Sequence, residues 1–319
     1  MKKIISALFF LYRKIYFKLQ CILFNKIINS KNAWLIFDKS NIPGFGTNLL
    51  RTYFPIYSTQ SFKESFSSKV ISMMEEVIKR NKAAELELKI INEMHQLLEL
   101  SEIEKDQIKP YLDNYFFGIF DAAILGAMMQ QYIPLKIIEI GSGISTRYMH
   151  FFKNKYSLKT KITCIDPFPR VEIEQVVDTF YKKPLESAIE ENEIQLAAGD
   201  FLFMDGSHYA FQGNDTLTFF FKLIPSIPSG VIIHIHDIYL PYDYDTNVSQ
   251  QLWAEQYILA AMLVNGLKDY EILYPAYYES CTNQQIINKL NEVNLTLGSR
   301  NFEKRKSHKE GYSFWMRKK

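Results

Sequence analysis

The sequence predicts an α/β protein built on a parallel sheet with helices on both faces and preceded by a helical N-terminal region. Three observations support this prediction. From residue 137 onward, short apolar segments alternate with helical segments, which is typical of a parallel sheet covered on both faces. Before that point, apolar residues recur mainly at helical spacing. The chain is 47% apolar and 23% charged, a composition that argues against disorder and against a polytopic membrane protein.

Residues 61–131 read as helix. Ile71, Met74 and Ile78 recur at helical intervals, and a second apolar run over 121–132 stops before Pro134, where a helix is expected to end. A length of 319 residues fits about two domains. We therefore expect a helical accessory region at 1–110, which starts with a basic amphipathic segment, and a domain at 111–319 that carries the sheet.

The expected strands are five to nine residues long and rich in β-branched and aromatic residues. They cover 137–141, 162–166, 201–205, 231–237, 270–278 and 312–317. Helices are expected between them at 145–153, 215–223 and 253–264. In such a sheet, ligands bind at the carboxyl ends of the strands.

Charge and cysteine content narrow the functional classes. The net charge is only +2, so bulk charge gives no reason to expect a nucleic-acid partner. The three cysteines, Cys21, Cys164 and Cys281, form no CxxC pair, so neither a disulfide framework nor a zinc knuckle is indicated. A reducing cytoplasm is the simplest expectation.

The first thirty residues combine basic and aromatic residues without an acidic one. Arg13, Lys14 and Lys18 interrupt the apolar run after Lys3, so neither a secretory signal nor a transmembrane helix is predicted. A basic amphipathic helix on the anionic inner face of a membrane fits this composition. Packing against the chain's own domain or against a partner subunit fits it equally well.

The first expected strand of the sheet leads into a glycine-bearing turn. Glycines there allow positive φ and close approach of a ligand to the backbone, and a serine or threonine can cap the helix that follows. Asp166 follows the second strand, 25 residues after Gly141, where a carboxylate can accept hydrogen bonds from the hydroxyls of a ribose. Thr146 stands where a dinucleotide fingerprint requires a third glycine, so a nucleoside ligand is favoured over nicotinamide or flavin.

Five segments of the chain resemble a known family. IIEIGSGIST, CIDPFPR, GDFLFMDGSH, SGVIIHIHDIYLPYDY and LWAEQYILAAML are similar to the pattern of class I S-adenosylmethionine (SAM) dependent methyltransferases, and within them of the methyltransferase domain 24 subgroup. The resemblance covers about residues 110–319 and implies a Rossmann-like, mostly parallel seven-stranded sheet whose last strand is antiparallel. It implies SAM as cofactor, bound by Glu139, Gly141, Ser142, Gly143, Thr146 and Asp166.

The chemistry of methyl transfer directs attention to the next two strand ends. The enzyme must position an acceptor and remove its proton, and the near-neutral reference pKa of a histidine suits His208 to this task as general base. Asp205 and the pair His236 and Asp237 should converge with it at the same edge. His234 lies deeper in its strand, on the same face as His236, and is expected to be a core histidine.

A divalent metal is a further possibility at this edge. Metal-dependent sugar O-methyltransferases of similar fold use an Asp-x-x-His element, which Asp205 and His208 match, and then an acidic pair, which His236 and Asp237 replace here. The candidate metal ligands are Asp205, His236 and Asp237.

Two other segments bear on the acceptor. The loop 239–245 is rich in tyrosine and aspartate and could recognise a polyol by stacking and hydrogen bonds, or could be a surface turn. Trp253, Tyr257, Ala261 and Val264 recur at helical spacing and are expected in the core. The basic tail 304–309 is expected in a solvated hairpin loop.

The leading hypothesis is a SAM-dependent O-methyltransferase that acts on a hydroxyl of a sugar, glycan or related small molecule. Two alternatives stay open. One is a non-haem metal oxygenase or hydrolase that uses His208, His236 and Asp237 as ligands. The other is a non-catalytic binding module held at a membrane by residues 1–30.

Overall fold

The computed structural model describes residues 34–37, 49–52, 65–79, 84–101, 103–114, 116–245, 248, 251–298 and 310–319. The chain divides into two compact units, residues 1–63 and 64–319. In the first, strands β1 (Trp34–Phe37) and β2 (Leu49–Thr52) pair antiparallel. The basic segment 1–30 and the tail 304–309 lie outside the described residues. The boundary expected at residue 110 stays a prediction.

The second unit contains a seven-stranded sheet in the order β5-β4-β3-β6-β7-β9-β8. Its strands are β3 (Lys136–Ile140), β4 (Lys161–Ile165), β5 (Thr179–Tyr181), β6 (Phe201–Met204), β7 (Ile232–Ile235), β8 (Tyr270–Pro275) and β9 (Phe314–Lys318). Strand β9 is antiparallel to β7 and β8, and the pairs among β3 to β7 are parallel. The expected architecture, including the antiparallel last strand, is confirmed.

The chain reverses its direction of travel across the sheet beside β3. It runs outward from β3 to β4 and β5, and then returns to form β6 on the other side of β3. The carboxyl ends of β3 and β6 therefore flank the topological switch point, where open α/β sheets bind their ligands.

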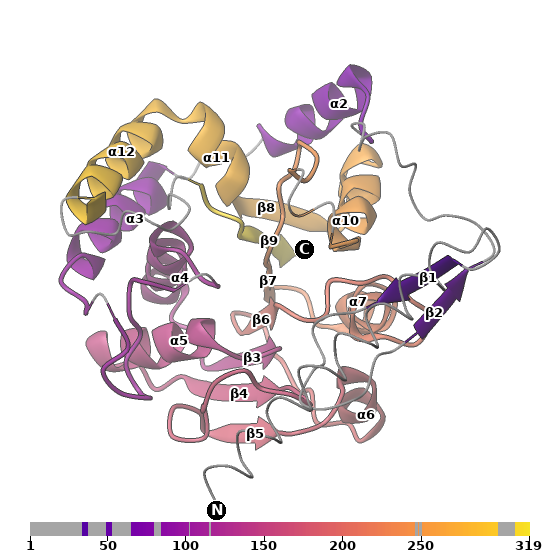
Figure 1. The fold of residues 1–319 in the computed structure, drawn as a ribbon, viewed down its shortest axis with the longest axis horizontal. Helices are drawn as coiled ribbons and strands as arrows, with labels where there is room; N and C mark the ends of the chain where they lie inside the picture. The colour runs from indigo at the N-terminus through magenta and orange to yellow at the C-terminus, as the bar shows by residue number, and fades with distance from the viewer. Residues whose placement is uncertain are drawn as a thin grey trace, which may run out of the picture. The chain divides into compact units, whose positions relative to one another are not determined.

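Helices cover both faces of this sheet (Figure 1). One side carries α3 (Ala84–Leu97), α4 (Ile119–Tyr132), α5 (Ile144–Lys155) and α12 (Gln284–Gly298); the other carries α2 (Ser68–Ile78), α6 (Leu185–Glu190), α7 (Asp215–Thr218) and α10 (Glu255–Val264). A π-helical turn (Phe219–Leu223) and α8 (Ile224–Ser226) extend α7, and α11 (Ala276–Thr282) follows β8.

The strands feed two separate hydrophobic cores because alternate side chains point to opposite faces. In β6, Phe201 and Phe203 enter the core under α3, α4 and α5, while Leu202 and Met204 enter the core under α2, α7 and α10. Burial on both faces explains why these strands are continuously apolar rather than alternating.

The observed secondary structure differs from the expectation in two places. The helical region expected over 61–131 contains three helices among its described residues, and the described residues between α3 and α4 are not helical. Pro110 lies among these residues, and the Asn114 side chain accepts hydrogen bonds from the backbone N–H groups of Phe116 and Phe117, which competes with helix formation. The strand expected over 270–278 stops at Pro275, where α11 begins.

Candidate active site

The turn after β3 requires a glycine at position 141. Gly141 has φ +82, and a Cβ there would lie 1.9 Å from the carbonyl oxygen of Asp205. The Asp205 backbone N–H donates to the carbonyl of Ile140 at 2.9 Å, which pairs this turn with the end of β6. In contrast, a Cβ on Gly143 would meet no protein atom within 4 Å. Gly143 therefore borders open space at the start of α5.

Glu139 anchors the first turn of α5 from inside the core. Its carboxylate accepts hydrogen bonds from the hydroxyls of Ser145 at 2.5 Å and Thr146 at 2.6 Å, and from the Cys164 thiol at 3.0 Å. Thr146 Oγ1 in turn accepts from the backbone N–H of Gly143 at 3.0 Å. Burial raises the pKa of Glu139 to about 7, although the three hydrogen bonds oppose the shift. Glu139 and Thr146 thus shape the glycine turn from behind.

Asp166 faces the same turn from the end of β4. Its Oδ2 accepts from the Ser142 hydroxyl at 2.7 Å and its Oδ1 from the backbone N–H of Phe168 at 2.7 Å. An ionised carboxylate has about four acceptor positions, so these two contacts leave capacity for the hydroxyls of a bound ribose. The acid and the glycine turn meet as the sequence predicts.

Four titratable side chains gather where β6 and β7 end. His208 Nε2 lies 3.7 Å from Asp205 Oδ1 and 3.6 Å from Asp237 Oδ2. His236 Nδ1 lies 3.8 Å and 3.5 Å from the same two oxygens. The side chains of Asp205 and Asp237 are 27% and 19% exposed, whereas those of His208 and His236 are 9% and 3% exposed. The carboxylates therefore face the opening and the imidazoles support them.

The acidic and basic side chains of this cluster shift one another's pKa values. Burial lowers the pKa of His208, but Glu255, Asp237 and Asp205 outweigh burial and raise it to about 9. Burial likewise lowers the pKa of His236, but Asp237 and Asp205 raise it well above its usual value. Burial raises the pKa of Asp205. At Asp237 burial acts in the same direction, but His236 and His208 together with Arg170 lower the pKa below its usual value. The carboxylates thus favour the charged form of the two imidazoles, and the imidazoles favour the charged form of the carboxylates.

Residues outside the strand ends hold the two histidines. Glu255, the first residue of α10, places Oε1 2.9 Å from His208 Nδ1. Asp121 in α4 places Oδ2 3.8 Å from His236 Nε2, and the Phe117 ring stacks on His236 with centroids 5.1 Å apart. His208 and Asp237 both have left-handed backbones, with φ +66 and +57, a strained conformation common at functional sites.

Three of these side chains could hold a divalent cation. One ligand atom each from Asp205, His208 and Asp237 lies within 4.8 Å of the others. Two carboxylate oxygens and one imidazole nitrogen are a donor set that divalent cations accept, so the residues present fit a metal. His236, which the sequence suggested as a ligand, does not belong to this trio and lies deeper.

Comparison with known proteins finds a family match over part of the chain. Residues 138–238 match the model of a family described as a methyltransferase domain. The match begins in β3, before the glycine turn, and ends just after Asp237, so it spans both halves of the site. Over residues 138–238 the chain is therefore similar to a methyltransferase domain.

No curated protein matches the chain in sequence. Among solved structures, cmcI with Mg and SAM has a TM-score of 0.33 and 12% identity, over 47% of this chain and 62% of that chain. The chain therefore spans less than two thirds of that cmcI chain. Coclaurine N-methyltransferase bound to N-methylheliamine and SAH has a TM-score of 0.30 and 12% identity, over 78% of this chain and 94% of that one.

The sheet brings both predicted groups of residues to one of its edges. The Gly141 turn and Asp166 form the expected cofactor side, and Asp205, His208, His236 and Asp237 lie beside it. His234 is fully buried, stacks on Phe203 and pairs with the Ser313 hydroxyl at 3.1 Å, as expected of a core histidine.

The sequence pattern did not predict that Glu255 and Asp121 reach this site. The apolar stripe expected at Trp253, Tyr257, Ala261 and Val264 has the wrong phase, because Ala261 is exposed. The buried face of α10 instead consists of Glu255, Gln256, Leu259, Ala260 and Leu263. A lone acid within an otherwise apolar helix was the available signal, since a buried carboxylate needs a partner.

The loop 239–245 packs through its tyrosines into an aromatic cluster. Tyr239 and Tyr244 are buried in this cluster, and Tyr239 stacks on Tyr312 with centroids 4.6 Å apart.

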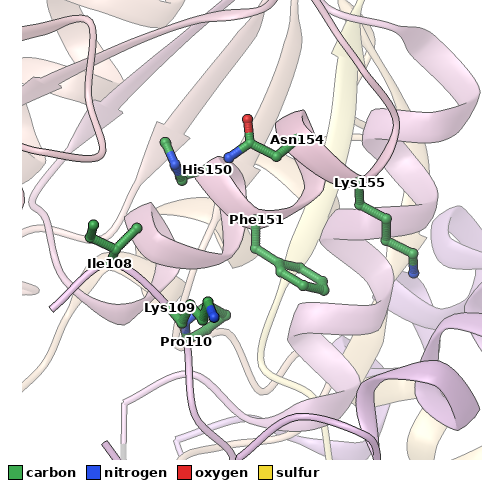
Figure 2. A pocket seen from close by; sticks show the side chains of 7 residues that line it. All are labelled: Ile108, Lys109, Pro110, His150, Phe151, Asn154 and Lys155. Carbon is green, nitrogen blue, oxygen red and sulfur yellow. The ribbon is translucent and has the colours of Figure 1, made fainter. Parts of the chain in front are cut away.

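A separate surface pocket lies beside α5 (Figure 2), lined by Ile108, Lys109, Pro110, His150, Phe151, Asn154 and Lys155. None of its lining residues belongs to the site described above.

Proposed function

We propose that this chain is an O-methyltransferase that transfers the methyl group of SAM to a hydroxyl of a sugar, glycan or related small molecule. The observation that carries the proposal is the packing of the Gly141 turn against the carbonyl of Asp205. It sets a candidate methyl-donor site next to Asp205, His208 and Asp237, where an acceptor would need a base. The family match favours methyl transfer over the oxygenase or hydrolase alternative.

The side chains at this edge suit a hydroxyl acceptor. A hydroxyl must lose its proton as its oxygen attacks a methyl group, whereas a neutral amine already offers a lone pair. His208 directs Nε2 toward the partly exposed carboxylates of Asp205 and Asp237, at 3.7 and 3.6 Å. His208 is therefore the proposed general base, and the two aspartates are proposed to orient the acceptor.

A sugar or glycan is supported by the surroundings of the site. The half-buried Trp253 ring lies beside His208, with centroids 4.3 Å apart. Aromatic faces beside carboxylates can bind the apolar and hydroxyl-bearing faces of a sugar ring.

A divalent cation would fit this chemistry. If a cation is bound, Asp205, His208 and Asp237 would hold it, and it would lower the pKa of the acceptor hydroxyl. His208 would then act as a ligand instead of as the general base. The charge of the cation would also disfavour the protonated form of His208. If the cation is required, chelation should abolish turnover and added Mg²⁺ should restore it.

The test is a methyl-transfer assay on the full-length protein with methyl-labelled SAM. Nucleotide sugars and glycans are offered beside matched amino sugars, and the position of the new methyl group is read by mass spectrometry. Methylation of a sugar hydroxyl is the expected result. Methyl transfer only to nitrogen would contradict O-methylation, and labelled methyl on no acceptor would count against the sugar class.

Membrane contact and a cytoplasmic location are proposed from the sequence alone. The described residues contain no helix long and apolar enough to cross a membrane. The basic residues before position 31 would bind an anionic surface peripherally. Full-length protein should sediment with vesicles rich in anionic lipid, and a variant with Arg13→Glu and Lys14→Glu should stay in the supernatant.

A further inference from the structure

Three consecutive residues before and at the start of α10 hold His208. The Trp253 ring lies against the imidazole with centroids 4.3 Å apart. The Ala254 backbone N–H donates to the carbonyl of His208 at 2.8 Å. Glu255 Oε1 lies 2.9 Å from His208 Nδ1. One segment of three residues thus contacts the imidazole ring, the backbone carbonyl and the Nδ1 atom of His208.

These contacts stabilise a backbone conformation of His208 that is unfavourable by itself. His208 has φ +66, in the left-handed region that costs a non-glycine residue roughly 1–2 kcal/mol. Asp215 fixes the same loop from the other side by accepting a hydrogen bond from the Ser207 backbone N–H at 2.7 Å. The loop is therefore held between α7 and α10.

Glu255 is committed to His208 rather than to general packing. It is 2% exposed, and its Oε1 accepts from the Tyr244 hydroxyl at 3.3 Å besides contacting His208. Its Oε2 is buried without a hydrogen-bond partner. A carboxylate placed only to stabilise the fold is expected to satisfy both oxygens.

We propose that Glu255 is a positioning residue that orients His208 and selects its tautomer. In the neutral ring, Glu255 Oε1 accepts a hydrogen bond from Nδ1–H, and Nε2, which then carries no proton, is directed at the opening. At 3.7 and 3.6 Å, Nε2 makes no direct hydrogen bond to Asp205 or Asp237. Nε2 is therefore free to accept a proton from an acceptor, a role that rests on the proposed function.

The proposal is tested with Glu255→Gln in the full-length protein. A glutamine amide can donate to Nδ1 and so favours the tautomer that carries its proton on Nε2. The expected result is a fall in kcat of about 10- to 100-fold, as for other carboxylates that orient a histidine, with an unchanged Kd for SAM. Glu255→Asp should recover part of the loss.

The matched control is Glu93→Gln. Glu93 is also a buried carboxylate, at 3% exposure, but it pairs with Lys155 away from this site. It should leave kcat unchanged. An unchanged kcat in Glu255→Gln, or an equal loss in Glu93→Gln, would overturn the proposal.

A second readout does not depend on turnover. Nitrogen-15 spectra of the wild-type protein, taken above the titration of His208 and assigned with His208→Gln, should show the neutral ring protonated on Nδ1. Protonation on Nε2 would overturn the proposal even if Glu255→Gln failed to fold. If no acceptor is ever methylated, the proposed function fails, while the tautomer still decides the role of Glu255.

Discussion

Gly141 and Asp205 are in such close contact that a single Cβ on the glycine would lie 1.9 Å from the aspartate carbonyl oxygen. This contact links the turn proposed to bind the methyl donor to the loop proposed to bind the acceptor. The two loops follow neighbouring strands, β3 and β6, at the point where the sheet reverses its order. Their separation is therefore set by backbone packing rather than by flexible side chains.

Gly141→Ala should destabilise the fold. The left-handed backbone at φ +82 costs an alanine about 1–2 kcal/mol, and the clash with the Asp205 backbone adds to this. Urea unfolding should show a loss of at least that size. Gly143→Ala serves as the control, since its φ of 176 is open to any residue. Equal stability of the wild type and Gly141→Ala would show that the contact is misplaced.

Gly143→Ala should weaken SAM binding without loss of stability. Its methyl group would enter space in which no protein atom lies within 4 Å, and where the proposed ligand approaches the backbone. An increase in Kd of about tenfold, near 1.4 kcal/mol, is expected by calorimetry. An unchanged Kd would mean that the ligand does not approach Gly143.

His208→Ala should separate binding from turnover. Loss of a general base typically costs about 10²- to 10⁴-fold in rate, whereas the cofactor side of the site is built from other residues. The expected outcome is a fall in kcat in that range with the Kd for SAM unchanged. Full activity in this variant would remove the base assignment.

Much of this site could be predicted because its residues stand at strand ends. Gly141, Asp166, Asp205 and Asp237 each follow an apolar strand, and parallel strands bring such positions to one edge. Glu255 and Asp121 lie on helices far from the strand ends in the sequence. The sequence alone therefore does not show that Glu255 reaches His208 or that Asp121 reaches His236.

The remaining gaps in the fold have local causes. β5 (Thr179–Tyr181) has only three residues, too few to show alternation. The long helix α12 does carry a stripe at Ile286, Leu290, Val293 and Leu297 that helical spacing could have revealed. The three-way division of the region 61–131 depended on turn chemistry around Asn114, which apolar periodicity does not report.

Glu139 should make stability fall with rising pH. Its folded pKa is raised to about 7, while an unfolded glutamate titrates near 4.3. Between these values the folded state binds more protons, so its contribution is complete below about pH 4.3 and is lost as the pH rises through 7. Glu139→Gln should show a shallower decline in unfolding free energy between pH 5 and 8. Parallel curves for the two proteins would mean that Glu139 is ionised throughout.

Calorimetric titration with SAM tests the central claim most directly. Wild-type protein should bind SAM, and Asp166→Ala, checked for an unchanged thermal transition, should lose most of that affinity. Asp269→Ala is the control, because Asp269 is exposed and precedes β8 at the opposite end of the strands. Equal affinity in Asp166→Ala and wild type would contradict the account, since the acid beside the glycine turn would then bind no part of the methyl donor.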